Sequence, residues 1–579
     1  MAKDDLVQRF IDENNTTVVR RLANYQPNQW DYNAIRFITN NFTEEAYDPL
    51  VKKLKEEVRA LLSETEPVAQ IMLIDSIEKL GLGYYFVEEI ERLLNDMLIS
   101  GYPKVVRKDG LHVTAVLYRL LRQHGLMISQ DIFDYFKDDD GSFMASLSHD
   151  AKGLLSLYQA SSLSFEEENT MDAARAFAAT HLKTMNASEI LSFAKEIAHE
   201  MELPSHWRPT RLEARRYIDI YEKEEDTNPT LLRFAKLDFN MVQNVHQREL
   251  AKVTSWWMNL GLGKKLGFAR DRILECFFGV IIIVFQPQFG YCREWLAKVG
   301  ALLVVVDDIY DAYGSLDELE LFTRVVERWE IKELENLAEC MKICFINISN
   351  IVDEMARNSQ RNGGLDILPY LRKAWADLCK SFLVEAKWQN DKYVPTFEEY
   401  IKNGWVSVSG PLILVHTFFL MRQEITVEAL ENMRSCPKVV RLASTVFRLC
   451  NDLATSTAEQ ERGGSPTSIQ CYMKENGVSE VDARAYISSV ISQTWKELNQ
   501  ELILCSSLPQ YFMEACTNLA RMAVCLYQHR DGFGIPTHET KSQIKSLLIT
   551  PIPFAEKGIA NNSHQWCSVY QGQKSKVAL

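Results

Sequence analysis

Apolar residues recur at helical spacing along almost the whole chain, and this restricts the fold more than any other feature. In segment 51–62 they stand at i, i+3, i+7, i+10 and i+11, which is one face of an α-helix. Segments 67–80 and 84–99 repeat the pattern, with Gly81 and Gly83 as breakers between them. Sustained alternation of apolar and polar residues, typical of half-buried strands, is not found. We therefore predict an all-α protein.

One charge-rich stretch, residues 222–229, interrupts this pattern. Within it, Asn228 suits a helix N-cap and Pro229 suits a first helical turn, so a new helix is expected to begin there. The 579 residues are too many for one small domain. We predict an N-terminal helical domain over residues 1–228 and a C-terminal helical domain over residues 229–555.

Composition excludes several classes of function. The formal net charge of −14 argues against binding nucleic acid or an anionic membrane surface. The longest apolar run, 276–285, is too short for a membrane span and predicts a buried helix. All twelve cysteines follow residue 275 without paired C-x-x-C spacing, so reduced thiols are expected. Residues 556–579 are polar and aperiodic and are predicted to form a mobile tail.

An acidic motif follows a wholly apolar run. Residues 301–306 are apolar, and Asp307-Asp308-Ile309-Tyr310-Asp311 comes next. On a helix Asp307 and Asp311 lie one turn apart on the same face. Unpaired carboxylates at a buried helix end are costly, so a cation is expected, and Mg²⁺ with its preference for oxygen ligands fits. The alternative is that these residues only cap a helix or lie on its surface.

A second set of oxygen donors lies further along the chain. Asn451, Thr455 and Glu459 stand at i, i+4 and i+8 of a predicted helix that Gly463 and Gly464 would end. Amide, hydroxyl and carboxylate oxygens in a row can chelate one Mg²⁺. Alone, such a row would often be a polar surface stripe. Two all-oxygen sets on facing helices, however, can hold one diphosphate between them.

Arginines flank both sets. Arg270 and Arg272 precede the first set, and Arg448 lies one turn before Asn451. Guanidinium groups bind phosphate oxygens through two parallel hydrogen bonds. Aromatic faces stabilise cations by about 0.5–2 kcal/mol each. The aromatic residues between these elements are Phe277, Phe278, Trp405, Phe447 and Tyr527. A diphosphate-binding metal site beside an aromatic cavity favours ionisation of an allylic diphosphate.

These motifs resemble those of class I plant terpene synthases. The residues Asp307-Asp308-x-x-Asp311 and Asn451-Asp452-x-x-Thr455-x-x-x-Glu459 are similar to the family's two metal motifs. Arg270-Asp271-Arg272 resembles its diphosphate-side arginine motif. Arg20-Arg21 followed by Trp30 resembles the tandem-arginine motif of the angiosperm monoterpene synthase subfamily. Four ordered motifs make a chance match very improbable, and the resemblance spans roughly residues 15–555.

The resemblance implies a C-terminal catalytic domain of the isoprenoid-synthase fold (the class I terpene cyclase fold) after a relict N-terminal helical barrel. In the family the first domain is catalytic only where it carries Asp-x-Asp-Asp. Residues 138–140 are Asp-Asp-Asp without that spacing, so proton-initiated chemistry is not expected. The family's N-terminal strand crosses the mouth of the active site, which makes residues 1–30 a lid containing Arg20, Arg21 and Trp30.

The resemblance also implies roles for single residues. Three Mg²⁺ ions are expected, with Mn²⁺ as an alternative, and their ligands would be Asp307 and Asp311 for two ions and Asn451, Thr455 and Glu459 for the third. Asp308 would lie beside these ligands rather than among them. Residues expected to contact or enclose the substrate are Arg270, Arg272, Arg448, Gly279, Gly300, Tyr527 and Asp531.

Three departures from the family pattern concern the product. Gly279 stands where the family usually has Trp on the cavity wall, which removes a cation–π surface of about 1–2 kcal/mol. Gln286 stands where Glu is usual, and Gly300 stands where Asn, Ile or Phe is common. Isoprene-forming enzymes have Phe at that last position, so isoprene is not the expected product. A wider pocket predicts weaker control of ring closure.

The predicted activity is Mg²⁺-dependent ionisation of geranyl diphosphate to a monoterpene olefin or alcohol. Acyclic or mixed products of the linalool, myrcene or ocimene type are favoured. The alternatives are a cyclic monoterpene synthase or a sesquiterpene synthase acting on farnesyl diphosphate. A chain-elongating prenyltransferase would be expected to carry two Asp-rich motifs, and a non-catalytic scaffold would not need both metal sets.

The sequence also bears on assembly and location. A monomer is expected, with a homodimer as the alternative. No secretory signal or transit-peptide composition is visible at the N-terminus. Residues 1–19 are too few for a full transit segment. The expected compartment is therefore the plastid if a transit peptide has been removed, and otherwise the cytoplasm.

Overall fold

The computed structural model describes residues 25–185, 193–361, 365–505, 507–534 and 536–554. It also describes the backbone of two antiparallel strands, β1 (Val7–Ile11) and β2 (Thr17–Arg21). The rest of the described chain is almost entirely helical, so the all-α class is confirmed. The hairpin was not predicted, because neither five-residue strand alternates apolar and polar residues. The predicted tail, 556–579, lies outside the described residues.

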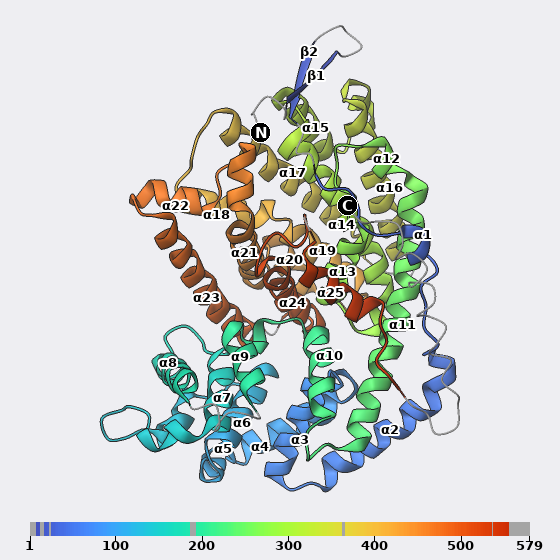
Figure 1. Ribbon diagram of the computed structural model, residues 1–579. Coiled ribbons are helices and arrows are strands. Elements are labelled where there is room, and N and C mark those ends of the chain that lie inside the picture. The colour runs from blue at the N-terminus through green and yellow to red at the C-terminus, as the bar shows by residue number, and fades with distance from the viewer. Residues whose placement is uncertain are drawn as a thin grey trace, which may run out of the picture.

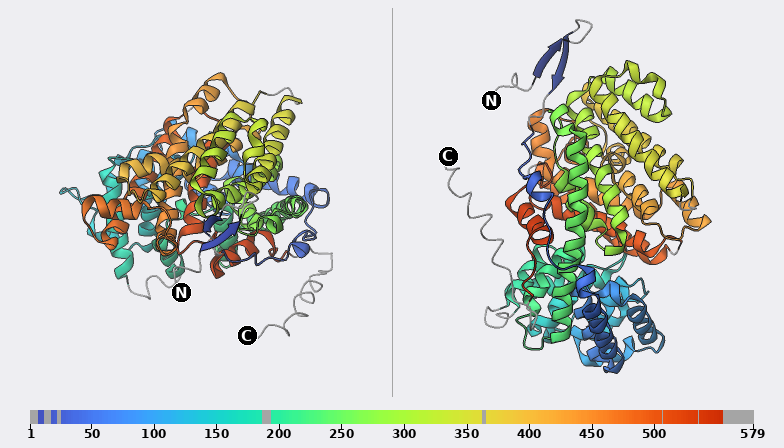
Figure 2. Two further views of the ribbon diagram at one scale, coloured as in Figure 1. Left: turned by 90° about the horizontal axis from the view of Figure 1, so that it is seen from above. Right: turned by 90° about the vertical axis from the view of Figure 1, so that its right-hand side faces the viewer.

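The N-terminal helices pack around a buried central helix, α6 (Leu111–Gln123), whose neighbours include α3 and α7. The remaining helices of this part are α1 (Tyr32–Ile35), α2 (Glu44–Glu64), α3 (Pro67–Lys79), α4 (Val87–Ile99), α5 (Pro103–Val106), α7 (Ala151–Ser161), α8 (Asn169–Thr184), α9 (Ala194–Glu202) and α10 (Thr210–Tyr221). Apart from α1, which lies higher beside α11, they form the lower part of the molecule, and the hairpin projects at the opposite end (Figures 1 and 2).

The C-terminal helices form the larger, upper part (Figure 1). They are α11 (Pro229–Leu260), α12 (Leu262–Lys265), α13 (Ile273–Ile283), α14 (Gly290–Asp308), α15 (Leu316–Arg328), α16 (Glu339–Arg361), α17 (Leu368–Asn390), α18 (Phe397–Ser407), α19 (Gly410–Leu420), α20 (Val427–Ser435), α21 (Lys438–Arg462), α22 (Ser468–Asn476), α23 (Glu480–Leu504), α24 (Gln510–Tyr527) and α25 (His538–Leu548).

Helix α11 begins where the sequence predicted. Asn228 accepts hydrogen bonds from the backbone of Thr230 and Leu231, and Pro229 occupies the first turn. Along its length, α11 packs against α2 and α10 of the N-terminal part and against α13 and α14 of the C-terminal part. The predicted domain boundary at 228/229 therefore falls at the start of a helix that both parts share.

Helix α13 is apolar on nearly every face and all of its residues are buried, as expected of a core helix. It packs against α14 and α24. Residues 397–420 are long and apolar enough to cross a membrane by length and composition alone. They form two helices, α18 and α19, with Ser409 in a left-handed conformation at the junction. Since 67% of that window is buried inside the protein, the stretch is part of the core.

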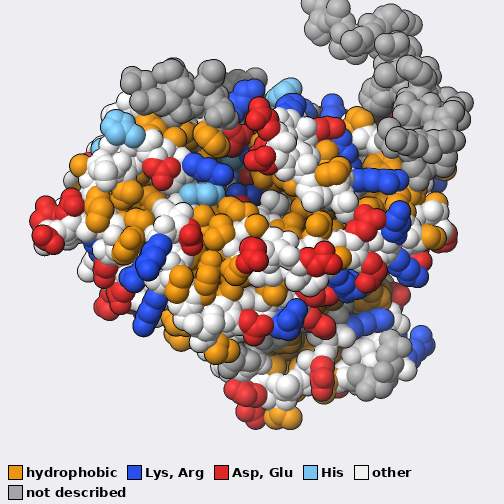
Figure 3. All heavy atoms as spheres, turned by 90° about the horizontal axis from the view of Figure 1, so that it is seen from below, with side chains coloured by type: hydrophobic (Ala, Val, Ile, Leu, Met, Phe, Trp, Pro, Cys, Tyr) orange, Lys and Arg blue, Asp and Glu red, His pale blue; other side chains and the backbone are white. Residues whose placement is uncertain are grey.

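Cysteine and surface chemistry agree with the sequence. The cysteines among the described residues are free thiols, and most are buried. On the face seen in Figure 3, acidic and basic side chains are interspersed rather than gathered into one broad basic area. That face therefore offers no extended surface for a polyanion.

Candidate active site

The aspartate motif, residues 307–311, lies at the end of α14. The apolar residues 301–306 are buried in the core, and directly after Asp308 the helix widens into a π turn, η8 (Ile309–Tyr313). Such turns are frequent at functional sites. Asp308 is fully buried, whereas Asp307 and Asp311 remain accessible. The sequence predicted ordinary α-helical spacing between Asp307 and Asp311. The structure instead places Asp311 in a π turn.

Arg270 joins two of these aspartates. Its backbone N–H and its Nε donate to Asp308 at 2.6 and 2.8 Å, and its Nη2 donates to Asp307. Burial raises the pKa of Asp308 to about 6, although Arg270 lowers it. Asp308 therefore orients the arginine. The guanidinium neutralises Asp307 where a metal ion is expected.

The Asn-Thr-Glu motif, residues 451–459, lies on α21 and is built in the same way. Asp452 is fully buried and pairs with Arg448 at 2.7 Å, and Arg448 also donates to the side-chain oxygen of Asn451. Thr455 donates its proton to the carbonyl of Asn451 at 3.0 Å, which leaves its hydroxyl lone pairs for another ligand. Gly463 ends the helix in a left-handed conformation, as predicted.

Carboxylates from three helical regions lie close enough to one another to interact. The pKa of Asp311 is raised by poor hydration and then by Asp307, Glu459 and Glu385. Burial raises the pKa of Glu385, on α17, to about 7, and Asp307 contributes. Repulsion of this kind indicates a shortage of positive charge. No sequence motif marked Glu385, because its position became apparent only when α17 packed beside the site.

This donor set fits divalent cations. Within the described ranges, no three His, Cys, Asp or Glu side chains converge as a closed metal site. The predicted ligands instead lie on two helices and include an amide and a hydroxyl. Mg²⁺ typically takes one or two carboxylates and fills its other positions with waters and substrate phosphates. An open, oxygen-rich set with excess negative charge meets that requirement.

The N-terminal segment, residues 25–32, covers the arginine motif. Its contacts with residues 270–275 are the guanidinium of Arg270 over the ring of Tyr25 at 4.8 Å, Arg272 Nη2 to Gln26 O at 2.6 Å, Trp30 Nε1 to Glu275 Oε1 at 2.8 Å and Tyr32 Oη to Asp271 Oδ1 at 2.7 Å. Strand β2, which contains Arg20 and Arg21, packs against η8 of the aspartate motif. Their side chains lie outside the described part of the chain.

The end of α24 and the segment after it, residues 527–534, cover the side of the site that carries the Asn-Thr-Glu motif. Burial raises the pKa of Tyr527, and its hydrogen bond with Asn451 lowers it. Asp531 accepts the backbone N–H groups of Phe533 and Gly534 at 3.2 and 2.7 Å. Arg272 was expected to bind substrate, but its Nη2 donates to the carbonyls of Gln26 and Gly534. Arg272 therefore ties the two covering segments together.

Gly279 and Gly300, which were expected to line the cavity, face neighbouring helices. A side chain at Gly279 would first meet Met522 of α24 at 3.7 Å, and one at Gly300 would first meet Cys276 of α13 at 3.5 Å. Both distances are ordinary van der Waals contacts, so a methyl group at either position would pack directly against its neighbour. Gln286 lies elsewhere, because its amide donates to Glu514 at 2.9 Å beside a cavity between the two parts of the molecule.

Comparison with known families identifies the chain. Residues 29–201 match the model of the terpene synthase N-terminal domain, and residues 258–497 match that of the terpene synthase family metal-binding domain. The second match contains both motifs and Arg270.

Individual relatives agree. The chain is 48% identical to (−)-alpha-terpineol synthase of Vitis vinifera, over 93% of this chain and 91% of that protein. It is 47% identical to a chloroplastic myrcene synthase of Quercus ilex, over 93% and 90%. Isoprene synthase from grey poplar, solved with three Mg²⁺ ions and dimethylallyl-S-thiolodiphosphate, superposes with a TM-score of 0.84 at 42% identity, covering 91% of this chain and all of that one. The chain therefore belongs to the plant terpene synthase family, as its motifs indicated, and is a carbon–oxygen lyase acting on a prenyl diphosphate.

Proposed function

We propose that the protein converts geranyl diphosphate to monoterpenes with Mg²⁺ as its cofactor. One observation carries the proposal: the carboxylates of the aspartate and Asn-Thr-Glu motifs lie close enough to interact, and an arginine lies at each motif. Two oxygen-donor sets and two guanidinium groups form a cradle for a diphosphate and its metal ions. The terpineol and myrcene synthase relatives favour a ten-carbon substrate.

The chain's own residues would act as follows. Asp307 and Asp311 would hold two ions, and Asn451, Thr455 and Glu459 would hold the third. Bound Mg²⁺ supplies Lewis-acid stabilisation of the departing diphosphate. Arg270 and Arg448 would turn from the motif residues to the phosphate oxygens. The carbon–oxygen bond then breaks with its electron pair staying on the diphosphate, which leaves an allylic cation.

The covering segments would exclude water while the cation reacts. The cation ends as an olefin when it loses a proton, or as an alcohol when it takes up water and then loses a proton. Gly279 and Gly300 carry no side chain where the family usually has Trp and often has Asn, Ile or Phe, which favours a pocket in which the substrate can remain extended. We therefore favour acyclic or mixed products of the linalool, myrcene or ocimene type over a single cyclic one, and the same space would admit farnesyl diphosphate.

The relatives also bear on location. The myrcene synthase relative is chloroplastic, which supports a plastid location for a precursor carrying a transit peptide. We retain the monomer as the expected state, and Mn²⁺ as an ion that the oxygen ligands would accept in place of Mg²⁺.

Gas chromatography of the products from geranyl and then farnesyl diphosphate, with and without Mg²⁺, tests the proposal. We expect Mg²⁺-dependent monoterpenes, mainly acyclic or mixed, and pyrophosphate release without added isopentenyl diphosphate. Absence of any monoterpene would refute the activity. A single cyclic monoterpene with no product from farnesyl diphosphate would refute the open-pocket interpretation alone.

A further inference from the structure

Helix α24 lies between residues of the candidate active site and a cavity of the molecule. On one side Met522 faces Gly279, and Tyr527 reaches the Asn-Thr-Glu motif. On the other side Glu514 and Arg521 line a cavity of 1810 Å³ between the N-terminal and C-terminal helices. A change in the way the N-terminal helices hold α24 would therefore reach the active site.

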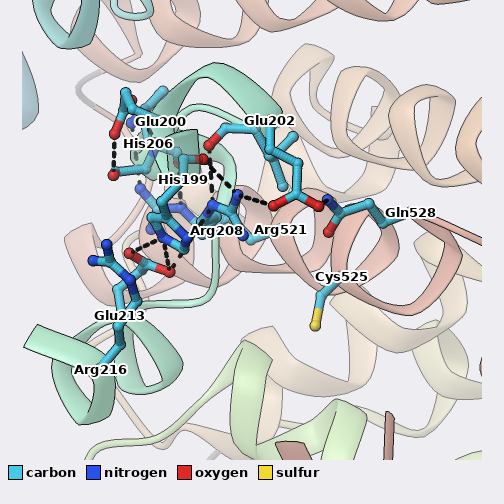
Figure 4. A network of polar contacts seen from close by, with 12 residues as sticks. His199, Glu200, Glu202, His206, Arg208, Glu213, Arg216, Arg521, Cys525 and Gln528 are labelled. Carbon is cyan, nitrogen blue, oxygen red and sulfur yellow. Dashed lines mark hydrogen bonds and ion pairs between the residues drawn. The ribbon is translucent and has the colours of Figure 1, made fainter. Parts of the chain in front are cut away.

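Arg521 makes the main polar contact between α24 and the N-terminal helices (Figure 4). Its Nε donates to the carbonyl of His206 at 2.8 Å, and its Nη2 lies 3.4 Å from the Nδ1 of the same residue. Its Nη1 donates to Asn518, one turn earlier on α24. Burial lowers the pKa of Arg521 to about 10. The guanidinium is thus held by both His206 and Asn518 and has little freedom to move.

The tautomer of His206 is fixed by its second partner. Asn499 of α23 donates its amide N–H groups to the carbonyls of Ser162 and Ser164 at 3.0 and 3.2 Å. Its side-chain oxygen must therefore accept the contact at 2.8 Å from the Nε2 of His206. With its proton on Nε2, neutral His206 offers Nδ1 as an acceptor to Arg521. In the contact between His206 and Arg521, called the joint below, every donor therefore faces an acceptor.

A second tie lies at the C-terminal end of α24. Gln528 donates to Glu202 of α9 at 3.1 Å, and Arg208 also approaches Glu202 at 3.5 Å (Figure 4). Half of the Glu202 side chain is exposed, so this tie is the weaker of the two. Both ties hold the last two turns of α24 against the N-terminal helices.

These turns lead directly into the covering segment. Tyr527 follows Arg521 by six residues, about 9 Å along the helix axis. The chain then turns back, with the N–H of Gly532 donating to the carbonyl of Leu526 at 3.0 Å. Arg272 next holds Gly534 together with Gln26 of the N-terminal segment. A continuous set of contacts thus joins His206 to the cover of the active site.

Building on the proposed function, we propose that His206 and Arg521 are positioning residues for the terpene synthase reaction. Through them the N-terminal domain sets the place of Tyr527 and of the segment 531–534 over the reacting cation. Neither side chain touches the substrate. Loss of the joint loosens the cover, admits water to the cation and leaves the diphosphate cradle unchanged.

The test compares Arg521→Met with wild type, both fed geranyl diphosphate. We expect kcat to fall about 10-fold, since a displacement near 1 Å can cost more, and KM to change less than about twofold because the cradle is intact. The alcohol-to-olefin ratio should change by about threefold or more, as expected when closure is poor. A purely structural role would lower the folded fraction without moving the product ratio.

His206→Ala repeats the test from the N-terminal side and replaces Arg521→Met if that variant does not fold. It should move the ratio in the same direction, and the double variant should add little because the residues act as one pair. The matched control is Lys496→Met, which removes a different polar contact between the two parts, the ion pair from Lys496 of α23 to Asp172 of α8 at 2.6 Å. It should leave kcat and the product ratio within about twofold of wild type.

A folded Arg521→Met protein with wild-type kcat and product ratio would overturn the inference. The same shift in Lys496→Met would also overturn it, because any interdomain contact would then suffice. If wild type itself makes no monoterpene in this assay, the proposed function fails instead.

Discussion

The two motif-bearing regions use the same device with different support. In each, a fully buried aspartate pairs with an arginine, and the arginine also bonds a predicted metal ligand. At the end of α14 the three residues are Asp308, Arg270 and Asp307. On α21 they are Asp452, Arg448 and Asn451. The guanidinium groups neutralise the ligands and also orient the donors that a diphosphate needs.

The supports of the two aspartates differ. Asp452 accepts the hydroxyl of Tyr400 at 2.9 Å and the backbone N–H of Ser468 at 3.1 Å, both from helices of the C-terminal part. Asp308 accepts the backbone N–H of Arg270 and hydrogen-bonds with Tyr25 of the N-terminal segment. The α21 region is therefore complete within its own scaffold. The α14 region is complete only when the N-terminal segment covers it.

Removal of a predicted ligand from either region should have the largest effect. Asp307→Ala and Glu459→Ala should each lower the rate of pyrophosphate release by about 10³-fold or more, because charge on the departing diphosphate loses its stabilisation. Initial rates at saturating Mg²⁺ measure this loss. Near wild-type activity in one variant would show that its residue is not a metal ligand. The two regions would then not contribute equally to catalysis.

Replacement of the buried aspartates should have a smaller effect. Asp308→Asn and Asp452→Asn should lower kcat/KM by about 10–100-fold, as expected for residues that orient ligands. Asp452→Asn should also lower the melting temperature more, since Asp452 ties α21 to α18 and α22. Kinetics and thermal unfolding of both variants check this. Equal melting temperatures would contradict the difference in support.

These supporting residues mark the limit of what the sequence predicts. Asp307, Asn451 and Arg270 could be predicted because their spacing repeats within one helix or one short motif. Tyr25, Glu385 and Tyr400 could not, because they meet the motifs only through contacts between distant segments. The π turn at residues 309–313 was also missed, because helical periodicity cannot distinguish it from an α turn.

Removal of the tyrosine hydroxyl that bonds each buried aspartate should have the smallest effects, and the two variants should differ in whether stability or catalysis is lowered. Tyr400→Phe removes a buried hydrogen bond to a carboxylate and should lower the free energy of unfolding by about 1.5–3 kcal/mol. Tyr25→Phe should leave stability nearly unchanged, yet lower kcat by a factor of about 3–10 because closure is less secure. Denaturant unfolding and steady-state kinetics separate the two. The reverse pattern would show that the N-terminal segment supports the fold and not the reaction.

The most direct measurement is calorimetric titration of the protein with inorganic pyrophosphate, with and without Mg²⁺. It reports on the cradle without depending on turnover or product. If the two regions hold a metal–diphosphate complex together, wild type should bind pyrophosphate strongly only when Mg²⁺ is present, and Asp311→Ala and Glu459→Ala should each lose most of that affinity. Equal binding without Mg²⁺, or wild-type affinity in either variant, would contradict the account.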